Sequence, residues 1–148
     1  AMIATTTHLN TPGPVLACLD GVHAVTGVTG FGLLGHLMEI CKGSGVRAHL
    51  RYADIPLLPR ASELVGTGFM TGASSRNWSS YGEGVQLGDG LEHVAKTLMT
   101  DPQTSGGLLV SCAPDTVTEV LSIFLQQGFS HVSVIGEVLE GAVGIDVS

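Results

Sequence analysis

Hydrophobic positions recur with a helical period in two parts of the chain. The two sets are Leu91, Val94, Ala95, Leu98 and Met99, and Val117, Val120, Leu121, Phe124 and Leu125. Both follow the spacing i, i+3, i+4, i+7, i+8, which places the side chains along one side of a helix. The first helix should end by Asp101, because Pro102 disfavours helical geometry in the residue before it. The second should run from near Pro114 to just before Gly128.

A third helix is predicted from about residue 31 to residue 42. Its apolar side is formed by Leu33, Leu34, Leu37, Ile40 and Cys41. His36, Glu39 and Lys42 are expected to point away from that side. Gly43 or Gly45 should end this helix, because glycine readily adopts the left-handed conformation found after helix ends.

Five stretches have the composition of β-strands. They are residues 22–26, 46–52, 107–112, 132–138 and 142–147. The last alternates cleanly and places Val143, Ile145 and Val147 on one face. Because strands and helices interleave along the chain, we predict an α+β fold, a layered α/β sandwich in which helices cover a mixed β-sheet.

Two segments lack such patterns. Residues 66–90 hold seven glycines and several serines without a stable period, so they are expected to form a long connection, less ordered than its surroundings. The run Thr11-Pro12-Gly13-Pro14 interrupts the start of the chain. Residues 1–20 are therefore interpreted as a linker or the tail of a preceding element, and residues 21–148 as the domain.

Composition and charge limit the possible functions. A length of 148 residues and a hydrophobic content of 44% suit one globular domain. The net charge of −7 argues against nucleic acid as a partner. Without a long apolar run or a signal-peptide pattern, we expect a cytoplasmic protein and no membrane partner. Cys18, Cys41 and Cys112 are expected to be small buried hydrophobic residues.

The stretch TGVTGFGLLGH, residues 26–36, places four glycines where a predicted strand meets a predicted helix. Such a turn presents unpaired backbone N–H groups and the positive end of the helix dipole, so a phosphate could bind there. The candidate residues are Thr29, Gly30, Phe31 and Gly32. Without a phosphate-binding lysine or a complete dinucleotide motif, the signal for an anion is weak, because such glycines also serve simply to pack a helix tightly on a strand.

Two further clusters carry polar groups suited to a ligand. The first, in residues 101–107, comprises Asp101, Gln103, Thr104, Ser105 and Gly106, which can hydrogen-bond a polar ligand or cap a local turn. The second is Arg76 and Asn77, where the guanidinium suits a phosphate oxygen, although an arginine in a loop is more commonly solvated. The six histidines show no spacing typical of a metal site.

Three segments together resemble the carboxy-terminal domain of selenophosphate synthetase (selenide, water dikinase), in the aminoimidazole ribonucleotide synthetase superfamily. They are HAVTGVTGFGLLGHLMEIC, SSRNWSSYG and LMTDPQTSGGLL, in the family's order and spacing. The resemblance implies a two-domain, homodimeric enzyme that makes selenophosphate, AMP and phosphate from ATP, selenide and water with magnesium. An amino-terminal ATP-binding domain would carry the reactive Cys or selenocysteine and the lysine.

This resemblance implies that the chain closes over the phosphate end of the site, with the phosphate approaching Thr29 and Gly30. It implies no catalytic residue here, no activity of the chain alone, and no tightly bound ATP or magnesium. The family has an Asp that helps to hold magnesium where this chain has Gly27, which offers no side-chain oxygen. A non-catalytic paralogue or anion-binding regulatory module is therefore the alternative, and a sister enzyme of the superfamily a third possibility.

Overall fold

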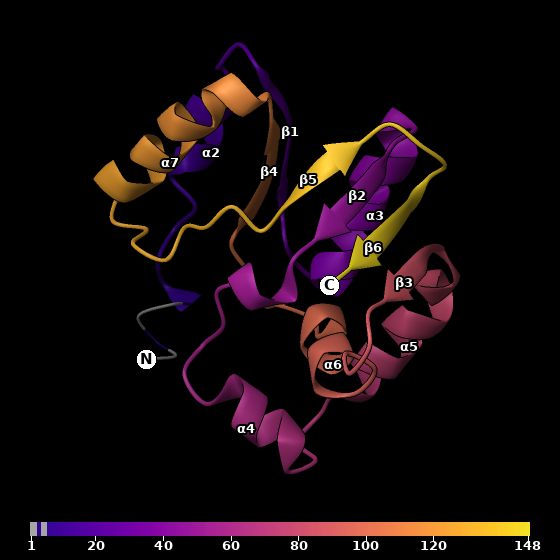
Figure 1. The fold of residues 1–148 in the computed structure, drawn as a ribbon. Helices are drawn as coiled ribbons and strands as arrows, with labels where there is room; N and C mark the ends of the chain where they lie inside the picture. Colours follow the sequence, from indigo (N-terminus) through magenta and orange to yellow (C-terminus); the bar gives the residue numbers. More distant parts are fainter. Residues whose placement is uncertain (1–2, 4–5) are drawn as a thin grey trace.

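The computed structural model describes residues 3 and 6–148 (Figure 1). The described part of the chain forms two sheets. β1 (Val22–Gly27) and β4 (Leu108–Cys112) form an antiparallel two-stranded sheet. The other four strands form a mixed sheet in the order β3-β6-β2-β5, in which only β5 runs antiparallel to its neighbour. These strands are β2 (Arg47–Leu50), β3 (Val85–Leu87), β5 (Gly136–Leu139) and β6 (Gly144–Val147).

Within the described residues, six helices accompany these sheets. They are α2 (Pro12–Leu16), α3 (Gly32–Ser44), α4 (Ala61–Gly66), α5 (Gly72–Tyr81), α6 (Val94–Thr100) and α7 (Val117–Gln126). Among them, α4 packs against α6. The main core joins α3 and α6 to the four-stranded sheet, with Leu34 and Ile145 fully buried. A second core joins α2 and α7 to the β1–β4 pair around Leu16 and Phe124 (Figure 1). The α+β class with a mixed sheet and covering helices is confirmed, although the strands divide into two sheets.

The three helices expected from the hydrophobic period are present, and their ends lie where local sequence signals place them. Gly45 ends α3 in the left-handed conformation, with φ of 67°. Asp101, which precedes a proline, is extended after α6, with ψ of 129°. Gly128 has φ of 88° just beyond α7. A 3-10 turn at Pro114–Thr116 precedes α7, and α6 begins three residues later than Leu91. No helix among the described residues is both long and apolar enough to cross a membrane.

The expectation of a long connection without structure over residues 66–90 is wrong, because this segment contains α5 and β3. The Thr71 side chain caps α5 by accepting a hydrogen bond from the Ser74 N–H at 3.3 Å. The buried positions of α5 are the polar residues Ser74 and Asn77. A helix that buries hydrogen-bonding side chains leaves no hydrophobic period in the sequence.

Other sequence expectations need smaller corrections. Cys18 is exposed rather than buried, while Cys41 is buried as expected. Val143 is exposed, whereas Ile145 and Val147 are buried in β6. Residues 132–135 precede the shorter strand β5 instead of belonging to it. The boundary near residue 20 stays a prediction, and α2 on its N-terminal side contributes Leu16 to the second core.

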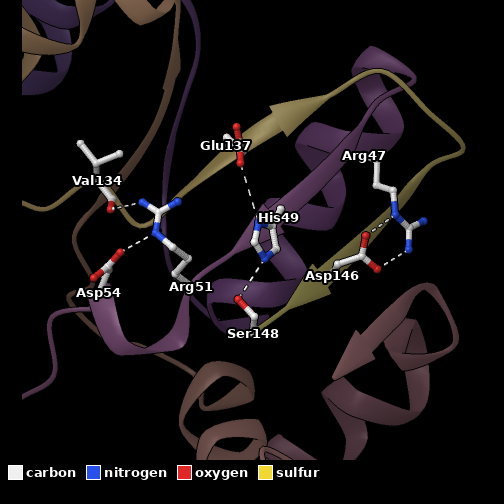
Figure 2. A network of polar contacts seen from close by, with 8 residues as sticks. All are labelled: Arg47, His49, Arg51, Asp54, Val134, Glu137, Asp146 and Ser148. Atoms are coloured by element: carbon white, nitrogen blue, oxygen red, sulfur yellow. Dashed lines mark hydrogen bonds and ion pairs between the residues drawn. The ribbon is translucent and has the colours of Figure 1, made fainter. Parts of the chain in front are cut away.

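One face of the four-stranded sheet is polar (Figure 2). Arg47, His49 and Arg51 alternate along this part of the chain with the buried Ala48 and Leu50. Figure 2 shows that each polar side chain has an acidic partner: Asp146 for Arg47, Glu137 for His49 at 3.8 Å, and Asp54 for Arg51 at 2.6 Å. Because both arginines are already paired, this face offers no unpaired guanidinium to an anion.

Candidate anion-binding site

The glycine-rich turn connects β1 to α3. The Val28 N–H donates to the Gly107 carbonyl at 2.9 Å, and the Gly32 N–H donates to the Thr29 carbonyl at 3.1 Å. Between them, the N–H groups of Thr29, Gly30 and Phe31 donate to none of the residues that the structure describes. These three residues are exposed at the start of a 13-residue helix. Free N–H groups at a helix N-terminus form an environment that favours an anion.

The glycines of the turn divide between packing and access. A Cβ atom on Gly32 would lie 2.7 Å from the Thr100 carbonyl carbon and 2.8 Å from the Met99 oxygen, so this glycine lets α3 approach the end of α6. Gly35 lies similarly close to the Tyr81 ring. Around Gly27 and Gly30, by contrast, no atom lies within 4 Å of the added Cβ. Gly32 and Gly35 therefore allow close packing of the helix, whereas Gly27 and Gly30 leave the turn open.

The fold brings residues from all three polar clusters of the sequence together at this turn. The Asn77 side-chain amide donates to the carbonyls of Gly30 and Thr100, each at 2.9 Å. The Gln103 backbone N–H donates to the Thr29 carbonyl at 3.0 Å. Gly106 lies so close to the Val28 carbonyl oxygen that no side chain fits there. Asn77, Gln103 and Gly106 thus hold the turn from outside.

Asp101 has a structural contact of its own. Its Oδ1 accepts hydrogen bonds from the hydroxyls of Thr71 at 3.0 Å and Ser74 at 3.3 Å, which ties the loop after α6 to the start of α5. The Gln103 side chain donates to the Asp101 carbonyl at 3.3 Å. This carboxylate therefore positions α5, the helix that carries Asn77.

Three of the predicted site residues have side chains without polar contacts to the described residues. Arg76, Thr104 and Ser105 are exposed, and their side chains form no hydrogen bond or ion pair with the described part of the chain. Their role at the site stays a prediction. Exposure leaves the Arg76 guanidinium available to a phosphate group without the energetic cost of breaking an existing ion pair.

The structure places three further residues at the turn, His36, Glu39 and Tyr81, which the sequence analysis did not assign to the site. Thr29 Oγ1 lies 3.0 Å from His36 Nε2, and His36 Nδ1 lies 2.9 Å from Glu39 Oε2. His36 was expected to point away from the apolar side of its helix, yet it is buried. The Tyr81 hydroxyl donates to the Phe31 carbonyl at 2.6 Å. Burial raises the pKa of Tyr81 to about 12, although a hydrogen bond from the Gly35 backbone lowers it, so this hydroxyl stays protonated at neutral pH.

No three His, Cys, Asp or Glu side chains in the described ranges lie close enough together to hold a metal ion. A cavity of about 1020 Å³ lies between the two sheets and is mainly apolar. Asp101, Gln103 and Gly106 line its edge, but Thr29 and Gly30 do not. The candidate anion site is therefore an exposed turn outside this cavity.

A strand and a helix joined by a glycine-rich turn, which a second polar loop holds in place, form the candidate anion site of an α+β domain. The chain belongs to the family described as AIR synthase related protein, C-terminal domain, whose pattern matches residues 9–147. It is 74% identical over 147 residues to a selenide, water dikinase of Dechloromonas aromatica and 57% identical to one of Burkholderia pseudomallei. Each match covers 99% of this chain and 42% of the relative, so the chain spans less than half the length of these proteins.

Solved structures of lower sequence identity share the fold. Thiamine-monophosphate kinase from Stenotrophomonas maltophilia has a TM-score of 0.57 and 20% identity, over 86% of this chain and 32% of that protein. Escherichia coli HypE has a TM-score of 0.59 and 16% identity, over 93% of this chain and 34% of that protein. At such identities the likeness concerns the fold alone.

Proposed function

We propose that this chain is the carboxy-terminal part of a selenide, water dikinase and that its glycine-rich turn binds a phosphate group in that enzyme. One observation carries the proposal: the three segments that resemble the family converge at a turn with three free N–H groups. The identity of 74% to a selenide, water dikinase supports the choice of reaction. The enzyme would convert ATP, selenide and water to selenophosphate, AMP and phosphate in the cytoplasm.

In this proposal the chain binds and shields phosphate, and the preceding part of the protein performs the covalent chemistry. The N–H groups of Thr29, Gly30 and Phe31 would bind phosphate oxygens, while Arg76 would add a positive charge. Asn77 keeps the turn in place. An amino-terminal ATP-binding domain would supply the nucleophile and the lysine and would form the homodimer. The chain alone is expected to be inactive.

The residues present do not fit a magnesium site. Gly27 has no side-chain oxygen, and the described residues contain no cluster of carboxylates. In the assembled enzyme, magnesium would therefore be held by residues outside this chain. The same observation favours a second candidate function, an anion-binding regulatory module without kinase activity.

A fusion protein separates these two functions. The part of the Dechloromonas aromatica protein that precedes the matched region is joined to this chain, and selenide-dependent AMP formation is measured. We expect activity from the fusion and none from the 148-residue chain. Activity of the chain alone would refute the proposed division of roles. A fusion that binds phosphate at the turn without forming AMP would identify the regulatory module.

The Gly27→Asp variant of the fusion tests the lost metal ligand. The position is open and its φ lies outside the left-handed region, so aspartate should be tolerated without strain. If the family site operates here, magnesium should bind at least about tenfold more tightly in the variant. The Gly27→Asn variant, which lacks the charge, serves as the control. An unchanged magnesium requirement would show that the metal is held by other ligands.

A further inference from the structure

The side chains of Thr29, His36 and Glu39 form a continuous hydrogen-bonded chain that leads from the glycine-rich turn into α3. His36 connects the other two, with its Nε2 3.0 Å from the Thr29 hydroxyl and its Nδ1 2.9 Å from a Glu39 oxygen. The His36 side chain is 9% exposed, whereas that of Glu39 is 59% exposed. A solvated carboxylate thus contacts one nitrogen of a buried ring, and a hydroxyl of the anion site contacts the other.

In a neutral imidazole, the hydrogen-bonding capacity of the two neighbours assigns the proton to one of the ring nitrogens. An ionised carboxylate can only accept hydrogen bonds. If Nδ1 carried a lone pair, two acceptors would face each other at 2.9 Å, so Nδ1 must carry the hydrogen and donate it to Glu39. Nε2 is then an acceptor, and the Thr29 hydroxyl donates its only proton to it. The Thr29 oxygen is left with lone pairs toward its other neighbours.

We propose that His36 and Glu39 are positioning residues that make the Thr29 side chain a hydrogen-bond acceptor, so that it recognises a phosphate oxygen that carries a proton. This inference rests on the proposed phosphate site at the turn. The backbone N–H groups of residues 29–31 donate to the unprotonated oxygens, and Thr29 Oγ1 accepts from the P–OH group. Hydrogen phosphate satisfies both requirements, whereas sulfate, which has no proton at neutral pH, satisfies only the first.

The first experiment tests the proton arrangement without any ligand. Nitrogen NMR of the 148-residue chain distinguishes the two tautomers of neutral His36. We expect the form protonated at Nδ1, and in Glu39→Ala we expect a shift toward the other form. Glu119→Ala, which removes an exposed carboxylate from α7, is the matched control and should leave the His36 spectrum unchanged. His36 protonated at Nε2 in the unaltered chain would overturn the inference.

The second experiment compares the binding of inorganic phosphate and sulfate to the chain and to Thr29→Val. Loss of a hydrogen bond between Thr29 and the P–OH group should weaken phosphate binding about tenfold and leave sulfate affinity within about twofold. Thr29→Ser keeps the hydroxyl and should restore the preference for phosphate. A loss of about tenfold for both anions would show that Thr29 donates to them and would overturn the inference.

These outcomes separate this inference from the proposed function. If neither anion binds to the unaltered chain, the phosphate site itself is refuted, and with it the selectivity assigned to Thr29. The NMR result would then still decide the direction of the Thr29 hydrogen bond. Thermal unfolding of Thr29→Val shows whether the unpaired Nε2 acceptor destabilises the fold, and the comparison of the two anions within one variant is independent of such a loss.

Discussion

Replacement of Gly32 by alanine should destabilise the fold more than any other single methyl addition in the glycine-rich turn. Gly32 has φ of 69°, in the left-handed region. Its added Cβ would lie 2.7 to 2.9 Å from three backbone atoms of Met99 and Thr100, at the end of α6. Backbone atoms in a packed helix cannot rotate away as the end of a side chain can, so α3 and α6 would have to separate.

The size of the effect follows from these two causes. A non-glycine residue in the left-handed region costs about 1–2 kcal/mol, and overpacking a well-packed contact costs about 1–3 kcal/mol. Alanine also lowers the conformational entropy of the unfolded chain, which raises the free energy of unfolding by about 0.4–1 kcal/mol. We therefore expect Gly32→Ala to lower the free energy of unfolding by about 1–5 kcal/mol. Gly30→Ala, two residues away in open space and without a positive φ, should change it by less than about 1 kcal/mol.

Urea unfolding followed by circular dichroism measures both variants on the same scale. The m-values should match that of the unaltered chain, because the surface exposed on unfolding is nearly the same. Equal midpoints for Gly32→Ala and Gly30→Ala would refute the reasoning, since the two variants differ only in backbone conformation and in the presence of nearby atoms. A crystal structure of Gly32→Ala should show the start of α3 displaced from Thr100.

Three further changes test other contacts. Gly106→Ala should destabilise the chain and disturb the turn, whereas Gly107→Ala, with no atom near its added Cβ, should be tolerated; thermal unfolding that ranks them the other way would contradict this. Asn77→Ala removes two hydrogen bonds to backbone carbonyls and should lower the free energy of unfolding by about 1–3 kcal/mol, with Ser79→Ala in the same helix as the control. The hydrogen bond from Arg47 lowers the pKa of Asp146, so its stabilising effect is present above the pKa of an unfolded Asp and is lost as the pH falls through the lower folded value. Asp146→Asn should therefore be less stable than the unaltered chain at pH 7 and equally stable at strongly acidic pH, and a difference that persists in acid would count against the pairing.

The ends of the helices could be predicted from the sequence because their causes are local. Gly45 and Gly128 adopt the left-handed conformation after α3 and α7, and Pro102 keeps Asp101 extended after α6. The hydrophobic period identified α6 and α7 for the same reason, since one side of each faces a core. The glycine-rich turn was also identified correctly as the entry to α3.

What only the tertiary structure decided is where polar residues are buried and which segments meet. His36 lies off the apolar stripe of α3, yet it is buried, with its ring hydrogen-bonded to the turn and to Glu39. Asn77 can be buried because its amide donates hydrogen bonds to the carbonyls of Gly30 and Thr100, which are 47 and 23 residues distant in sequence. A hydrophobic side chain is buried by its own solvation energy, which the sequence pattern reveals, whereas a polar one is buried only when the fold supplies its hydrogen-bond partners.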